Sequence, residues 1–85
     1  MQSNEIKSIF QSTFNDQKNI MTPETVRYGK SGSFLYELSR GLCMNGGELF
    51  GVTVLDIRGK HIHALSKSFE DKMEADKYIV GLRSS

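Results

Sequence analysis

Residues 49–57 read LFGVTVLDI and carry apolar side chains on both sides of an extended chain. One side holds Phe50, Val52 and Val54, and the other holds Leu49, Leu55 and Ile57. A strand that is apolar on both faces is typically central in its sheet and covered on both sides. We therefore expect this segment to lie inside a sheet, with a layer of structure on each face.

The residues after this strand predict a tight turn. Gly59, in the sequence IRGK at residues 57–60, favours a positive φ. We therefore expect a hairpin over about residues 48–66. Before it, residues 41–48, GLCMNGGE, have the composition of a flexible connection, which separates this hairpin from an earlier pair of strands.

The earlier hairpin is expected over about residues 26–40, around the sequence KSG. A two-residue loop at Ser31 and Gly32 would pair Tyr28 with Leu35 and place the apolar rows of the two strands on opposite faces. A three-residue loop, with Gly32 in the left-handed conformation, would place both rows on one face. The hydrophobic pattern favours the three-residue loop, and the shared row then comprises Val26, Tyr28, Phe34, Tyr36 and Leu38.

Apolar residues at helical spacing occur near both ends of the chain. Over about residues 4–15 they are Ile6, Ile9, Phe10 and Phe14. Asp71 and Glu74 match a capping box at the start of a second helix, expected over about residues 72–81. Its apolar stripe comprises Ala75, Tyr78, Ile79 and Leu82.

Together these patterns predict an α+β fold in a single domain over residues 1–85, because a chain of 85 residues has room for one core. The expected order is α-β-β-β-β-α. Two consecutive hairpins form a four-stranded antiparallel meander, which an N-terminal and a C-terminal helix flank.

The composition excludes a strong polyanion-attracting field over the whole molecule. The chain has 11 basic and 10 acidic residues and a formal net charge of +1, and neither half is strongly basic.

The single Cys43 cannot form an internal disulfide, which favours a reducing compartment. The longest apolar run is too short for a membrane span. We expect a cytoplasmic protein with no membrane partner.

Gly29, Lys30 and Ser31 match the last three letters of a phosphate-binding loop. Such a loop also has a glycine five residues before the Gly-Lys pair, where this chain has Glu24. It is followed by a helix whose N–H groups converge on the phosphates, whereas a predicted strand follows here. We interpret the match as part of a hairpin turn and expect no cofactor.

His61 and His63 are spaced so that a strand would direct both rings to the same side. A metal site needs three or four ligands, and Cys43 and Asp56 are the only suggestive supplements. If the turn lies at residues 58–59, His61 is opposite Asp56. We expect two solvated histidines and no metal. We also expect no enzymatic activity, because no nucleophile, base and orienting group converge in the sequence.

Aromatic and basic residues interleave along the first predicted hairpin: Arg27, Tyr28, Lys30, Phe34, Tyr36 and Arg40. Aromatic side chains on a sheet beside cations can stack nucleic-acid bases and contact phosphates. The alternative is that the three rings form the core face beneath the helices. The need of a small domain to bury its apolar surface favours the core.

Residues 63–79, HALSKSFEDKMEADKYI, resemble the last strand and helix of small three-stranded DNA-binding domains, the integrase arm-binding and plant AP2-type modules. The resemblance rests on Phe69, Glu74, Ala75, Tyr78 and Ile79. The same residues would also suit any strand-to-helix junction with a capping box. The chain departs from those modules by its N-terminal helix, its lack of Trp and the absence of a strongly basic sheet.

Two functional hypotheses follow. The first is a non-catalytic interaction module that acts as a homo-oligomer, because two short helices can hardly cover both faces of the sheet. Its expected contact residues are Leu35, Met44, Leu55 and Ile62. The alternative is a nucleic-acid-binding accessory factor, because the first and third connections of a meander lie at one end and would gather a basic rim of Lys30, Arg58 and Lys60. The small size and lack of motifs suit a viral or mobile-element accessory protein.

Overall fold

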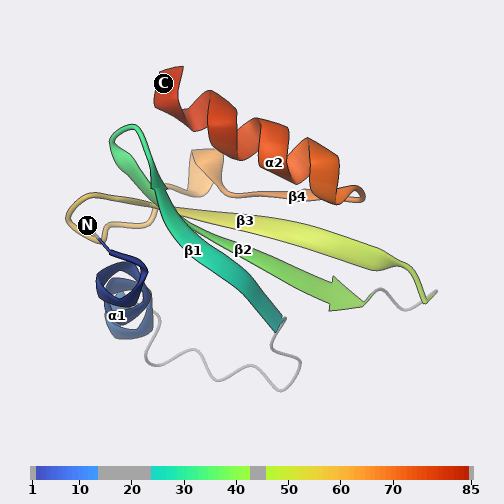
Figure 1. Ribbon diagram of the computed structural model, residues 1–85, viewed down its shortest axis with the longest axis horizontal. Coiled ribbons are helices and arrows are strands. Elements are labelled where there is room, and N and C mark those ends of the chain that lie inside the picture. Colours follow the sequence, from blue (N-terminus) through green and yellow to red (C-terminus); the bar gives the residue numbers. More distant parts are fainter. Residues whose placement is uncertain (1, 14–23, 43–45, 85) are drawn as a thin grey trace.

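The computed structural model describes residues 2–13, 24–42 and 46–84. Its helices are α1 (Ser3–Thr13) and α2 (Lys72–Gly81), and short 3₁₀ helices cover His63–Leu65 (η1) and Leu82–Ser84 (η2). The strands are β1 (Glu24–Ser31), β2 (Phe34–Leu42), β3 (Glu48–Asp56) and β4 (Lys67–Phe69). They form one antiparallel sheet in the order β1-β2-β3-β4 (Figure 1), which confirms the predicted α+β meander.

The two helices lie on opposite faces of this sheet, α1 below it and α2 above it in Figure 1. On the α1 face, Ile6 and Phe10 form a buried cluster with Leu35 and Leu55. The cluster on the α2 face is larger and comprises Tyr36, Leu38, Phe50, Val52, Val54, Ala75, Ile79 and Leu82. Each helix therefore covers one face with its own apolar stripe, and the sheet has two separate cores.

Strand β3 is covered on both faces along part of its length. Val54 and Leu55 are adjacent and point to opposite faces, and both are 0 % exposed. At either end of the predicted segment, Leu49 and Ile57 are 38 % and 53 % exposed. The doubly covered strand expected from the sequence is therefore found at its centre and not at its ends.

The turn of the first hairpin is shorter than expected. Ser31 pairs with Phe34, so the loop has two residues, Gly32 and Ser33. Gly32 has a φ of 60° and Ser33 does not have a positive φ. A glycine at the first loop position suits a type II′ turn, which matches the twist of the strands it joins. The predicted three-residue loop is therefore wrong, although Gly32 does have the expected positive φ.

This register places Tyr28 on the opposite face from Phe34, Tyr36 and Leu38. Tyr28 pairs with Glu37, and its ring centroid is 5.4 Å from that of Phe10 on α1. A register shift between Thr25 and Arg27 leaves Val26 41 % exposed. The single apolar row predicted for this hairpin is thus wrong, because α1 supplies a second core on which Tyr28 packs.

The second hairpin also departs from the expected range of residues 48–66. Gly59 has a φ of 90° in the turn, as expected, but β4 begins at Lys67. Between this turn and β4, His61 forms an isolated bridge with Leu55, and η1 follows. A regular strand was expected over these residues. Ile62 N–H still donates to the carbonyl of Val54 at 2.9 Å, so the edge of β3 stays paired without a regular strand.

Candidate interaction surfaces

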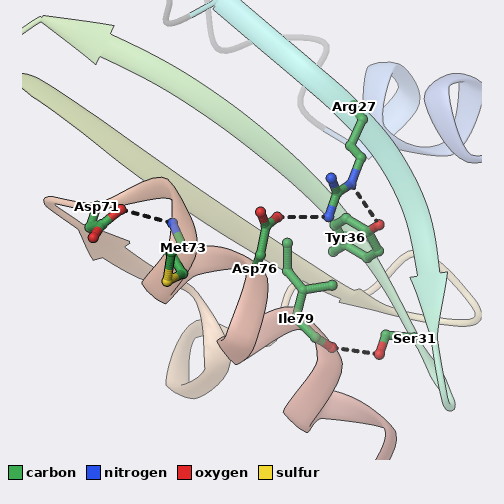
Figure 2. Close-up of polar contacts among 7 residues, drawn as sticks. All are labelled: Arg27, Ser31, Tyr36, Asp71, Met73, Asp76 and Ile79. Atoms are coloured by element: carbon green, nitrogen blue, oxygen red, sulfur yellow. Dashed lines mark hydrogen bonds and ion pairs between the residues drawn. The ribbon is translucent and has the colours of Figure 1, made fainter.

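A polar bridge fastens α2 to the first hairpin (Figure 2). The Arg27 guanidinium donates from Nε to the Tyr36 hydroxyl at 3.1 Å and from Nη2 to Asp76 Oδ1 at 2.9 Å. The bond to Tyr36, assisted by the charge of Asp76, raises the pKa of Arg27. Because Arg27 and Asp76 are both well exposed, their ion pair contributes little to stability. The bridge orients Tyr36 and occupies Arg27.

A buried contact joins the same two elements nearer the end of α2. Ser31 Oγ donates to the carbonyl oxygen of Ile79 at 2.6 Å, and Ser31 is 3 % exposed (Figure 2). This carbonyl belongs to the last turn of α2, where backbone acceptors run short of partners within the helix. The hydroxyl therefore holds the last turn of the helix on the hairpin.

The three aromatic residues of the first hairpin belong to the cores. Tyr36 is buried beneath α2, and Phe34 packs against the same cluster. Tyr28 packs against the cluster beneath α1, where burial raises the pKa of its hydroxyl. All three rings therefore pack against a core cluster, with Tyr36 buried and Tyr28 and Phe34 partly buried.

The Gly-Lys-Ser sequence lies in a strand and a turn. Gly29, Lys30 and Ser31 end β1, and β2 follows after two residues. A Cβ atom on Gly29 would lie 2.5 Å from the Tyr36 hydroxyl oxygen, so glycine is required here for the ring of Tyr36 to cross β1. The hairpin interpretation is confirmed, and the glycine serves packing.

His61 and His63 lie close together, though not on a common strand. Their ring centroids are 3.9 Å apart, with His61 in the bridge to β3 and His63 in η1. The predicted pairing of His61 with Asp56 is wrong, because the turn takes in residues 57–59 and Leu55 is opposite His61. Burial, followed by repulsion from His63, lowers the pKa of His61.

Ser66 links His61 to the sheet. Its Oγ lies 2.9 Å from Nε2 of His61, accepts from Val54 N–H at 2.9 Å and donates to the carbonyl of Ile62 at 3.3 Å. A hydroxyl with these contacts replaces a backbone partner for β3. The serine and histidine therefore act as structural groups at the end of the sheet.

The predicted basic rim lies at one end of the sheet. Lys30 is at the end of β1, and Arg58 and Lys60 flank Gly59 in the connection after β3. All three are exposed, and Arg58 lies 3.6 Å from the carboxylate of Asp56. Hydrogen bonds from the N–H groups of Lys60 and Arg58 hold the pKa of that carboxyl below its usual range.

Sequence reasoning missed a fourth cation at this end. A Cβ atom on Gly32 would lie 2.9 Å from the Cα of Arg83, which places η2 against the first turn. In Figure 1 the C-terminal end of α2 reaches the same turn. We call the exposed cations Lys30, Arg58, Lys60 and Arg83 the basic end; only the length and direction of α2 bring Arg83 to it.

The opposite end of the sheet is acidic. Glu24, Arg40, Phe50 and Phe69 lie on one row across the strands, and Glu48 pairs with Leu42 just beyond it. Because α2 starts directly after β4, its first acidic residues lie at this end too. We call the exposed residues Glu24, Glu48, Glu70, Asp71 and Glu74 the acidic end.

Large aliphatic side chains are exposed beside these carboxylates. Leu42 at the end of β2 is 74 % exposed, and Leu49 and Val26 on the neighbouring strands are partly exposed. They come from three adjacent strands within a few residues of the same row.

The expected oligomer contact is wrong for two of its residues. Leu35 and Leu55 are fully buried beneath α1 of the same chain, so neither has surface to offer a second subunit. Ile62 is half-buried and packs against the α2-face cluster. Met44 lies outside the described residues.

The described residues contain no cluster of three or more His, Cys, Asp or Glu side chains placed to hold a metal ion. Neither α1 nor α2 is long and apolar enough to cross a lipid bilayer. Comparisons of the chain with family models, with curated proteins and with solved structures gave no match.

Proposed function

We propose that this protein is a non-catalytic interaction module that acts as a homo-oligomer in the cytoplasm. It is of the size expected for an accessory protein of a virus or mobile element. The observation that carries the proposal is the exposure of Leu42, Leu49 and Val26 at one end of the sheet. A second subunit that covers them replaces the contact first expected at Leu35 and Leu55.

Leu42 is the most exposed of these three side chains. Fully burying a leucine side chain contributes about 1.5–3 kcal/mol, and a domain this small buries little apolar surface by itself. Leu42 and Leu49 point to opposite faces at the same end of the sheet, so a second subunit that covers both must contact the end of the sheet itself. Leu42 projects from a strand end, where its burial would strain no neighbouring backbone.

The test is the solution mass of the protein as a function of concentration, measured by sedimentation velocity. We expect the wild type to associate and Leu42→Ser to shift it toward the monomer. The control is Val80→Ser, which removes another exposed aliphatic side chain, from the outer surface of α2. A wild type that stays monomeric at high micromolar concentration would overturn the proposal.

A second candidate function, nucleic-acid binding, is favoured because Arg83 lies at the same end of the sheet as the predicted basic rim. Four exposed cations now share one end, where Asp56 is the only described carboxylate in the turns. We expect binding at low salt to weaken as salt rises, with the slope reduced by about one for each phosphate-contacting cation replaced. Fluorescence anisotropy with single- and double-stranded oligonucleotides tests it, with Lys60→Ala compared against Lys77→Ala on α2. Equal slopes for these two variants would exclude this use of the basic end.

A further inference from the structure

We propose that copies of this chain associate head to tail, with the basic end of one copy against the acidic end of the next. This inference rests on the proposed homo-oligomer and names the two surfaces that meet. It rests on the position of the charged side chains: acidic and basic residues lie at opposite ends of the molecule, although the formal net charge of the whole chain is +1.

The sheet register separates the charges. Ser31, Phe34 and Asp56 lie on one row at the turn end, and the four cations of the basic end surround it. The row of Glu24, Arg40 and Phe50 marks the other end. The five carboxylates of the acidic end lie at or beyond that row, where Arg40 and Lys72 are the opposing cations among the described residues.

Helix α2 reinforces the separation because it runs from the acidic end to the basic end. Its N-terminus follows Phe69, which pairs with Phe50, and its C-terminal extension η2 reaches Gly32. Glu70 and Asp71 directly precede the helix and Glu74 lies in its first turn, at one end of the molecule, and Arg83 follows the helix in η2 at the other.

Each end also exposes aliphatic side chains beside its charged residues. Ile57 is 53 % exposed beside Arg58 in the turn after β3. The acidic end exposes Leu42 and Leu49 beside Glu48. An apolar centre with a polar, charged rim is the usual anatomy of a protein interface, and the two rims have opposite sign.

Charge complementarity favours the head-to-tail arrangement over a two-fold dimer formed through two like ends. A two-fold contact between two acidic ends, or between two basic ends, places like charges against each other, which is costly at an interface. Contact between the acidic end of one copy and the basic end of the next places opposite charges against each other. Such a contact is heterologous, so repeated use of it gives a closed ring or an open filament.

Salt dependence is the first expected consequence. The charges that meet are exposed, and the Debye length falls from about 10 Å at 0.1 M salt to about 3 Å at 1 M. We therefore expect association to weaken by about tenfold or more over this range, because the electrostatic part of the contact is screened.

A pair of end-blocked variants tests the arrangement. The first, Arg58→Glu with Lys60→Glu, reverses the basic end and keeps the acidic end. The second, Glu48→Lys with Glu70→Lys, does the opposite. All four side chains are exposed, and circular dichroism checks that both variants keep the fold. Because both ends of each variant then carry the same sign of charge, we expect each alone to be monomeric. In an equimolar mixture, unlike ends of the two variants can meet at both the native and the reversed contact, so we expect the mixture to associate with the two variants in a 1:1 ratio.

The outcomes separate the two proposals. A wild type that is monomeric under all conditions overturns both the homo-oligomer and the head-to-tail contact. If the wild type associates and either variant alone reaches the same mass, or the equimolar mixture stays monomeric, the head-to-tail contact is wrong and the homo-oligomer stands on another surface. If either variant is unfolded, the single reversals Lys60→Glu and Glu48→Lys are mixed in its place and read by the same criteria.

Discussion

The Cα of Arg83 lies where a side chain on Gly32 would have to be, 2.9 Å from the Cβ position of that glycine. The contact joins residues from the first turn and from the last described segment of the chain. It fixes the end of α2 on the hairpin and brings a cation to the basic end.

Replacing Gly32 by Ala should therefore destabilise the fold twice over. The φ of 60° is unfavourable for a residue with a Cβ atom, and the methyl group would displace the Arg83 backbone. We expect the free energy of unfolding in urea to fall by about 1–3 kcal/mol. Gly81→Ala is the matched control, because a Cβ atom there meets open space. Equal stability of the two variants would contradict the contact with Arg83.

Ser31 and Asp76 both tie α2 to the first hairpin, and they should differ in importance. Ser31→Ala removes a buried hydrogen bond to the carbonyl of Ile79 and should cost about 1–3 kcal/mol. Asp76→Asn breaks an exposed ion pair with Arg27 and should cost at most about 1 kcal/mol. Urea unfolding of both variants measures the difference, and a larger loss for the Asp76 variant would show that the helix is held chiefly by the ion pair.

Ser66→Ala should weaken the edge of β3. The Ser66 hydroxyl accepts a hydrogen bond from the N–H of Val54, and the alanine variant leaves that N–H without this acceptor. We expect a loss of about 1–3 kcal/mol in the free energy of unfolding. Amide hydrogen exchange should quicken at Val54. Ser68→Ala, in an exposed position on β4, should change neither quantity, and similar behaviour of the two variants would exclude the role given to Ser66.

The stability of the fold should fall as the pH drops below about 6.5, the ordinary pKa of histidine. Burial and the neighbouring His63 lower the pKa of His61 in the folded state. The unfolded chain therefore binds the proton first, and the free energy of unfolding rises with pH until both states are neutral. Urea unfolding between pH 5 and 8 measures this slope. His61→Gln should flatten it, and an unchanged slope in that variant would assign the effect to another group.

Local sequence patterns determined several elements of this protein. Asp71 is the N-cap of α2, as the sequence predicts, and its carboxylate accepts from Met73 N–H at 2.9 Å. Gly32 and Gly59 both have the positive φ expected of turn glycines. The apolar alternation of residues 50–55 placed β3 inside the sheet. Each of these depends on the conformational preference of a few neighbouring residues, or on a period that the sequence displays directly.

Only the tertiary structure decided which face each side chain occupies and which ends of the molecule carry charge. Tyr28 lies beneath α1 because that helix provides a separate core, and for the same reason Leu35 and Leu55 are hidden from any second subunit. Arg83 reaches Gly32 because α2 crosses the sheet from one end to the other. These relations join residues far apart in the chain, so they depend on how the helices dock on the sheet, which no local pattern specifies.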